Sequence, residues 1–273
     1  FFAGPIQIFV YCMLVFGTYA VWIARKMKMQ KPYLMHIVIP GIILAITSPV
    51  WIRLISYLPS SSRIAGSSWT AEGFFIPLRH LVQFIVPDYF GNPATLNYWG
   101  TWNYGEMVGY IGVIGLLLAL IGISARSGFW IGIVCVSLLF AVDSPISRLP
   151  FILHIPGISS LQPTRLLSIV DFGLSILAAY GMASLMAGVK KRQVIIPGII
   201  LLTVFAGAWI SVLIPTSFGI PMEQIAIVKR NLILPSVMFA AAIGMVGAIV
   251  LLKKSLVTLR SVGALMVIIL LSF

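Results

Sequence analysis

Charged side chains are scarce in this sequence, since Asp, Glu, Lys and Arg together make up only 9% of its 273 residues. A soluble globular domain carries about 25% charged residues. Hydrophobic residues account for 60% of the chain, and its mean hydropathy is +1.08. This composition excludes a soluble globule and predicts an all-α, polytopic transmembrane helix bundle.

Cysteine and histidine are also few, with two and three copies. Cys12 and Cys135 both fall inside apolar runs, so we expect two buried thiols. The sequence contains no CxxC and no HExxH pattern, which argues against a zinc site built by the protein alone. A divalent cation held by carboxylates and a substrate phosphate stays open.

Long apolar runs recur along the whole chain. About 20 apolar residues are needed to cross a bilayer, and the sequence predicts about eight spans, the last one truncated, at 4–24, 33–52, 106–123, 128–143, 166–188, 194–214, 232–252 and 261 onward. The first run lacks the basic start and cleavage site of a signal peptide. We therefore expect an internal fragment, lacking the N-terminal part of a longer protein. We expect one transmembrane domain over 1–273, with two spans in 1–52, a loop over 53–105 and further spans in 106–273.

The net charge of +12 sorts by side of the predicted membrane. The loops on one side carry no acid and a set of basic residues, namely Arg25, Lys26, Lys28, Lys31, Arg126, Lys190, Lys191, Arg192, Lys253, Lys254 and Arg260. The loops on the other side mix basic residues with acids, namely Glu72, Asp88, Glu106, Asp143 and Glu223. Lys and Arg are in excess in cytoplasmic loops, so loops 53–105 and 144–165 are predicted to face outward. Nucleic acid is not needed to explain the basicity.

The first outward loop contains a polar stripe on a predicted short helix over 77–86. Pro77 can begin that helix, and Arg79, His80 and Gln83 share one narrow face of it. We expect the helix to lie in the membrane interface or to re-enter the bilayer. Alternatively, the stripe points at lipid headgroups only.

The stretch 87–112 follows and gathers the candidate polar residues Asp88, Asn92 and Glu106. A carboxylate at the membrane boundary is expensive unless it has a partner. The two carboxylates, Asp88 and Glu106, could act as a general base, a metal ligand or a clamp on a sugar hydroxyl. Glu106 could equally be an ordinary residue of a helix N-terminus, where the helix dipole favours a negative charge.

The second outward loop, 144–165, carries Arg148, His154 and Arg165, and Asp171 lies nearly two turns into the next span. An ionisable residue inside a membrane span is a functional candidate. The guanidinium fork suits phosphate oxygens, so these arginines could hold a lipid phosphate. Asp171 could instead pair with Arg165 or Arg148 for structure alone.

Three stretches carry a resemblance to a known family: PDYFGN at 87–92, GEMVGYIGVIGLLLAL at 105–120 and LPFILHIPGISSLQPTRLLSIVDFGLSILAAYG at 149–181. This pattern resembles the bacterial YfhO-like integral membrane proteins of the GT-C glycosyltransferase superfamily. In that family an outward turn precedes a Glu and a Tyr at a helix mouth, here Glu106 and Tyr110. Gln162 stands where a second arginine is expected, which weakens the phosphate clamp.

The resemblance implies a bacterial cell-membrane enzyme that moves a sugar from a polyprenyl-phosphate donor to a cell-envelope polymer or lipid acceptor on the outer face. It also implies a catalytic carboxylate in an earlier outward loop, outside this chain, so the catalytic residue is unknown. Asp88, Glu106 and Arg165 are then binding residues at best. A flippase or transporter, or a non-catalytic assembly subunit for lipid-linked saccharides, is the alternative.

Overall fold

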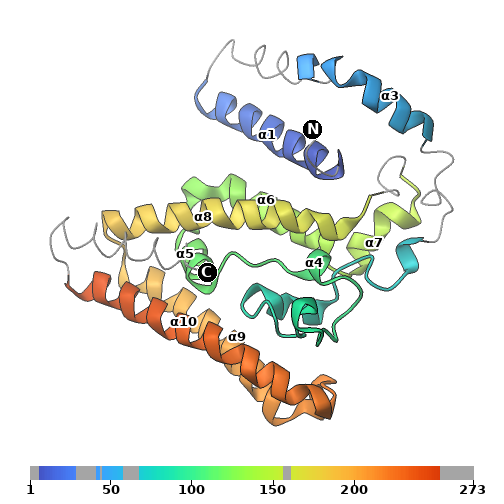
Figure 1. Ribbon diagram of the computed structural model, residues 1–273. Coiled ribbons are helices and arrows are strands. Elements are labelled where there is room, and N and C mark those ends of the chain that lie inside the picture. Colours follow the sequence, from blue (N-terminus) through green and yellow to red (C-terminus); the bar gives the residue numbers. More distant parts are fainter. Residues whose placement is uncertain (1–5, 29–40, 44, 58–67, 156–160, 253–273) are drawn as a thin grey trace. The chain divides into compact units, whose positions relative to one another are not determined.

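A computed structural model describes residues 6–28, 41–43, 45–57, 68–155 and 161–252 (Figure 1). Regular structure in these ranges is helical, apart from one isolated parallel bridge between Ile76 and Val142. The all-α prediction is therefore confirmed for the described part of the chain.

The chain divides into two compact units, each described here by itself. The first contains Phe1–Ile76 and Cys135–Ile169, and the second contains Pro77–Val134 and Val170–Phe273. The single transmembrane domain over 1–273 stays a prediction.

The first unit holds α1 (Ile6–Lys26), α3 (Ser48–Tyr57), the second half of α6 (Gly128–Ala141) and the whole of α7. The helix α7 (Pro145–Ile152) begins with a capping box, in which the Ser144 hydroxyl accepts from the Ser147 N–H at 3.1 Å and Pro145 follows as the first helical residue. The capping box places a helix inside a segment that the sequence predicts only as a loop.

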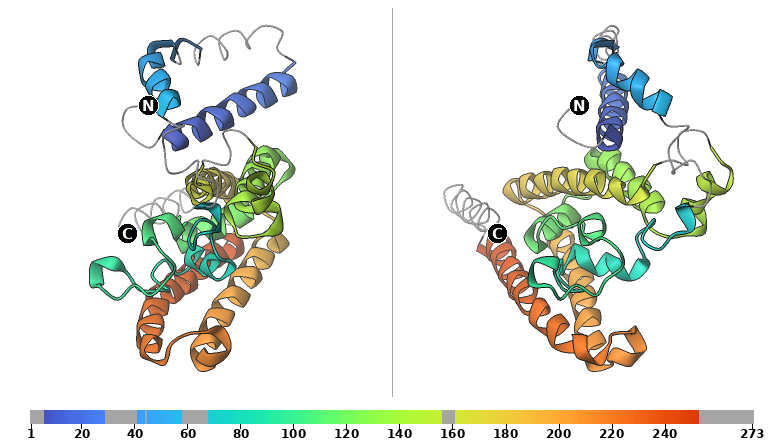
Figure 2. Two further views of the ribbon diagram at one scale, coloured as in Figure 1. Left: turned by 90° about the vertical axis from the view of Figure 1, so that its right-hand side faces the viewer. Right: turned by 45° about the vertical axis from the view of Figure 1, so that its right-hand side comes forward.

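The second unit is built around α9 (Lys191–Leu213) and α10 (Ile225–Leu252), which run antiparallel and side by side (Figures 1 and 2). Its other elements are η4 (Leu78–Phe84), η5 (Pro93–Thr95), α4 (Tyr104–Met107), α5 (Val113–Ile121), the first half of α6 (Gly128–Ala141) and most of α8 (Leu167–Ala187). The short helix η4 lies where the sequence predicts one, and its place in an interface stays a prediction.

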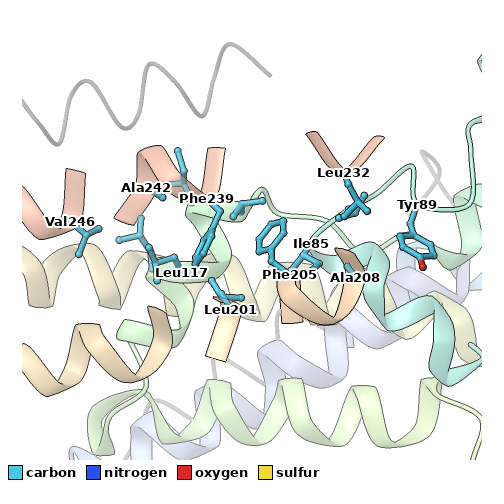
Figure 3. Close-up of a cluster of buried hydrophobic side chains, with 14 of the residues drawn as sticks. Ile85, Tyr89, Leu117, Leu201, Phe205, Ala208, Leu232, Phe239, Ala242 and Val246 are labelled. Atoms are coloured by element: carbon cyan, nitrogen blue, oxygen red, sulfur yellow. The ribbon is translucent and has the colours of Figure 1, made fainter. Parts of the chain in front are cut away.

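A row of buried apolar side chains joins α5, α9 and α10 to the segment that follows η4. Figure 3 shows this row running from Val246 and Ala242 past Leu117, Phe239 and Phe205 to Tyr89. The rings of Phe205 and Phe239 stack at a centroid distance of 5.0 Å. The segment after η4 is thus packed onto α9 and α10 by the hydrophobic effect, which also packs these helices onto each other.

α5 and α8 approach each other closely at two glycines. A Cβ atom added to Gly122 would collide with the main-chain oxygen of Leu177, and one added to Gly181 would collide with that of Leu118. Small residues allow this approach of backbones, as is usual between membrane helices.

Four helical segments are long and apolar enough to cross a membrane: Gln7–Lys26, Pro163–Ala187, Lys191–Leu213 and Met222–Val250. They indicate a membrane protein. They match the spans predicted at 4–24, 166–188, 194–214 and 232–252. The predicted span at 261 onward lies outside the described residues. Of the one at 33–52, residues 33–40 and 44 also lie outside them, and residues 48–52 form the start of α3.

The spans predicted at 106–123 and 128–143 differ from the structure. α5 has only nine residues, and the pair Val113–Ile121 and Ala125–Ala141 is bent by 107°, so it forms one broken span or a re-entrant loop. The helix is interrupted before α5 because Gly112 adopts φ 82°, a conformation that L side chains rarely adopt. The described residues therefore contain four to five candidate spans.

Two smaller expectations also change. α10 begins at Ile225, so Lys229 and Arg230 lie on a helix instead of in the loop predicted before 232. The expectation of two buried thiols is wrong for Cys135, which is exposed, while Cys12 is partly buried.

Candidate functional site

A pocket of about 660 Å³ lies between the loop after η4, the start of α5 and one face of α10. Its polar lining residues are Asp88, Tyr110, Arg230 and Asn231. Its apolar lining residues are Pro87, Ile111, Val113, Ile114, Leu234, Pro235 and Met238, together with the backbone of Gly112. The pocket is within the usual size range for small-molecule sites, with an apolar wall and a few convergent polar groups.

The carboxylate of Asp88 is held by two neutral donors. Tyr104 donates its hydroxyl to Oδ1 at 2.6 Å, and Asn92 donates Nδ2 to the same oxygen at 2.9 Å. Within the described residues no cation pairs with this carboxylate, and Oδ2 carries no hydrogen bond. Asp88 is thereby fixed in orientation while one oxygen stays open for a further donor.

Asn92 is itself fixed by the turn that follows it. Its Oδ1 accepts from the N–H of Ala94 at 2.8 Å, and its own N–H donates to Asn97 Oδ1 at 2.8 Å. This local bonding is characteristic of Asn in turns. Asn92 therefore positions Asp88 and does not line the pocket.

Two long-range hydrogen bonds attach this loop to the helices behind it. Asn231 of α10 donates Nδ2 to the main-chain oxygen of Asp88 at 2.6 Å, and the hydroxyls of Tyr89 and Ser211 of α9 lie 2.5 Å apart. The loop carrying Asp88 is consequently attached near the C-terminal end of α9 and near the N-terminal end of α10.

Buried polar groups of η4 also form hydrogen bonds with each other and with the loop that contains Thr101. His80 is fully buried, its Nδ1 lies 2.6 Å from Gln83 Oε1, and its Nε2 accepts from the N–H of Thr101 at 3.3 Å. This pattern requires the neutral imidazole with its proton on Nδ1. Burial lowers the pKa of His80 to about 4, in spite of an opposing effect from the bond to Gln83. The stripe predicted to face an interface is instead partly internal.

The pKa values of two neighbouring tyrosines are raised: Tyr104, which bonds to Asp88, and Tyr98, whose ring packs on that of Tyr104. Burial is the largest cause raising the pKa of Tyr104, and its hydrogen bond to the Asp88 carboxylate raises it further. Burial also raises the pKa of Tyr98 to about 12. Tyr104 therefore stays protonated at physiological pH and donates its hydrogen bond to Asp88 permanently.

Arg230 faces the same pocket from α10. Its Nε makes a long hydrogen bond of 3.4 Å to Asn231 Oδ1, and in the described part of the chain no salt bridge joins it to Asp88 or to another acid. Two opposite charges thus line one pocket without pairing with each other.

The remaining candidate residues of the first outward loop and the helix mouth after it are Tyr110 and Glu106, and only Tyr110 lines the pocket. Burial raises the pKa of the Tyr110 hydroxyl. Glu106 sits in the first turn of α4, is half-buried and is not among the lining residues. The negative charge of Glu106 at a helix start agrees with its alternative, structural explanation.

Arg148 and His154 belong to the first unit. The Arg148 guanidinium binds both oxygens of Asp143, with Nε to Oδ1 at 2.7 Å and a second nitrogen to Oδ2 at 2.8 Å. His154 is exposed and bonds through Nδ1 to the main-chain oxygen of Ile152 at 2.9 Å. Both have partners inside their own segment.

Arg165 lies at the start of the α8 segment and joins a buried amide network. It donates to Gln7 Oε1 at 3.3 Å, and the same oxygen accepts from the main-chain N–H of Gln162 at 3.2 Å. Gln162 also donates Nε2 to the main-chain oxygen of Gly73 at 3.3 Å. Gln162, at the position where an arginine was expected, thus links α1, the 73–74 segment and the start of α8.

Asp171 lies on α8 in the second unit, and its Oδ1 is buried with no hydrogen-bond partner among the described residues. Asp88 and Glu106 also belong to the second unit, whereas Arg148 and Arg165 belong to the first. The predicted approach of Arg165 to Asp88 or Glu106 therefore stays a prediction.

The chain matches no family model, no curated protein and no solved structure. The resemblance to the YfhO-like family, carried by the motifs at 87–92, 105–120 and 149–181, therefore stays a prediction. Among the described residues, no three His, Cys, Asp or Glu side chains are grouped so that they could hold a metal ion.

Sequence reasoning missed Arg230 and Asn231. Both were assigned to a solvated loop because the apolar run of α10 becomes continuous only after them. The available signal was the helical spacing of Arg230, Leu234 and Met238, four residues apart, which places a charge and two apolar side chains on one helix face.

Proposed function

We propose that this chain is part of a membrane glycosyltransferase of the GT-C type, which moves a sugar from a polyprenyl-phosphate donor to a cell-envelope acceptor on the outer face. The observation that carries the proposal is the oriented carboxylate of Asp88 in a pocket that also has an apolar wall. Sugar hydroxyls are donors to carboxylates, and a lipid-linked donor needs an apolar surface beside its head.

The charge pattern supports an outward position for this pocket. Lys191 and Arg192 begin α9, so one end of the antiparallel pair carries basic residues. The positive-inside rule assigns that end to the cytoplasm. The pocket lies on the opposite half of α10, along with the loop that carries Asp88.

The depth of the pocket supports a lipid-linked substrate. Arg230 is eight residues after Met222, where the candidate span of α10 begins, which corresponds to about 12 Å along a helix that rises 1.5 Å per residue. Met238 lies about 12 Å further along. The pocket therefore falls within the candidate span, at a level where a soluble nucleotide sugar would be an unsuitable donor.

The test is transfer of radiolabelled sugar from polyprenyl-phosphate donors to envelope acceptor by the protein in proteoliposomes. Asp88→Asn keeps an oxygen that accepts from Tyr104 and Asn92 but removes the charge, and we expect transfer to fall at least about tenfold. Asp143→Asn is the matched control, because that carboxylate pairs with Arg148 and not with the pocket.

Equal transfer by the wild type and Asp88→Asn would remove Asp88 from the site. If the wild type transfers no sugar from any donor but binds lipid-linked saccharide saturably, the function is that of a flippase or an assembly subunit.

A further inference from the structure

We infer that the pocket takes a lipid phosphate in a fixed orientation, with the phosphate on Arg230, the donor groups of the head on Asp88 and the chain along Leu234 to Met238. The phosphate position is argued from the lining of the pocket and the contacts of Asp88 and Arg230. The identity of the head as a sugar rests on the proposed function.

The first argument is the unpaired state of two opposite charges. Asp88 and Arg230 line the same pocket, yet no salt bridge joins them within the described residues. An ionic side chain within a membrane span is costly unless it has a partner. Asp88 is held away from Arg230 by Tyr104 and Asn92 at 2.6 and 2.9 Å, so the pair does not collapse when the pocket is empty of ligand.

The second argument is the chemistry that satisfies both charges at once. The guanidinium of Arg230 presents a planar fork of donors that suits phosphate oxygens. The carboxylate of Asp88 accepts hydrogen bonds and therefore needs hydroxyl or amine donors. A phosphodiester whose head carries such donors supplies both, whereas a fatty acid or a neutral glyceride does not.

The third argument is the direction of the apolar lining. Leu234, Pro235 and Met238 follow Arg230 along α10, toward the half of the helix remote from the turn at residues 215–224. The polar groups thus lie nearer that turn, and the apolar wall extends deeper into the candidate span. An amphiphile with its head at Arg230 and Asp88 has its chain on this wall.

This assignment differs from the clamp predicted from Arg148 and Arg165. Arg148 is bound to Asp143, and Arg165 donates to Gln7. Arg230 is the arginine that faces a described pocket.

The experiment measures binding of two probes to the protein in nanodiscs: a short-chain polyprenyl phosphate and its hexose conjugate. Arg230→Gln should weaken both probes about tenfold or more, because a charge-assisted hydrogen bond to phosphate is lost. Lys229→Gln is the matched control, since this exposed neighbour does not line the pocket, and should change neither Kd more than about twofold. Asp88→Asn should weaken the conjugate alone.

Equal Kd values for Arg230→Gln and Lys229→Gln would overturn the phosphate position, and so would a wild type that binds neither probe. If Arg230→Gln weakens both probes while the hexose conjugate binds no tighter than the bare phosphate, the phosphate position stands and the sugar head fails. If phosphatidylethanolamine vesicles then compete with the bare phosphate probe for binding, the group bound by Asp88 is an amine.

Discussion

The Nδ2 of Asn231 donates a hydrogen bond of 2.6 Å to the main-chain oxygen of Asp88, which lies 143 residues earlier in the chain. This bond fastens the candidate site to α10, and the hydrogen bond between Tyr89 and Ser211 fastens it to α9. The site is therefore a property of the assembled second unit and not of the loop alone.

Replacing Asn231 by Ala should loosen this attachment. The change leaves the Asp88 oxygen without its side-chain donor, and we expect the free energy of unfolding to fall by about 1–3 kcal/mol. Thermal unfolding in detergent and hydrogen exchange of residues 87–91 measure the effect. Lys229→Ala on the same helix is the control, and equal stability of the two variants would contradict the role of the bond.

The close approach of α5 and α8 predicts that replacing a glycine by alanine lowers stability at this contact but not at an open helix position. Gly122→Ala and Gly181→Ala force backbones apart and should each destabilise the protein by about 1–3 kcal/mol. Gly207→Ala on α9 meets nothing within 4 Å and should be neutral or stabilising by up to about 1 kcal/mol, because Ala favours helix more than Gly does. Melting temperatures in one detergent decide the point. A Gly181→Ala variant as stable as Gly207→Ala would show that the backbones do not touch.

Lowering the pH should reduce the stability of the folded protein through protonation of His80. Its pKa is about 4 in the folded protein against 6.5 for an exposed histidine, so the unfolded chain binds the proton first as pH falls. The stabilising contribution is complete above pH 6.5 and is lost progressively between pH 6.5 and pH 4, amounting to a few kcal/mol. Thermal unfolding across this window should show it. The His80→Gln variant should be less stable at pH 7 but lack this part of the pH dependence, and an unchanged dependence would exclude His80 as its origin.

The proposed sidedness predicts labelling of engineered cysteines. In a background with Cys12 and Cys135 replaced, Ser217→Cys lies in the exposed turn between α9 and α10, and Lys191→Cys lies at the basic end of α9. An impermeant thiol reagent applied to intact cells should label position 217, and should label position 191 only after permeabilisation. Labelling in the reverse order would place the pocket on the cytoplasmic side.

The long helices could be predicted because a single local property decides them. Runs near Gln7–Lys26 and Lys191–Leu213 are apolar over the length of a bilayer and have basic residues beside them, and both emerge as continuous helices. Pro77 likewise marks the start of the short helix η4, which begins at the next residue with Pro77 as its N-cap.

The interruption before α5 and the partners of the arginines could not be predicted in this way. Gly109 and Gly112 lie in an apolar run that is compatible with a continuous helix. In the structure α4 ends at Met107, Val108 is extended and Gly112 has a positive φ. Arg230 and Asp88 meet at one pocket because α10 packs on a loop far earlier in the sequence, and helical periodicity carries no information on such pairs. Local pattern therefore indicates which residues are polar in the membrane, and tertiary packing decides which of them share a site.

The separation of Asp88 from Asn231 also sets an order of events during synthesis. At about 5–20 residues per second, the ribosome needs roughly 7–30 s to make the 143 residues between them. For that time Tyr89, Phe90 and Ile85 lack the helices that bury them in the finished protein. A chain stopped before Ile225 would lack α10 and leave these side chains without part of the surface that buries them.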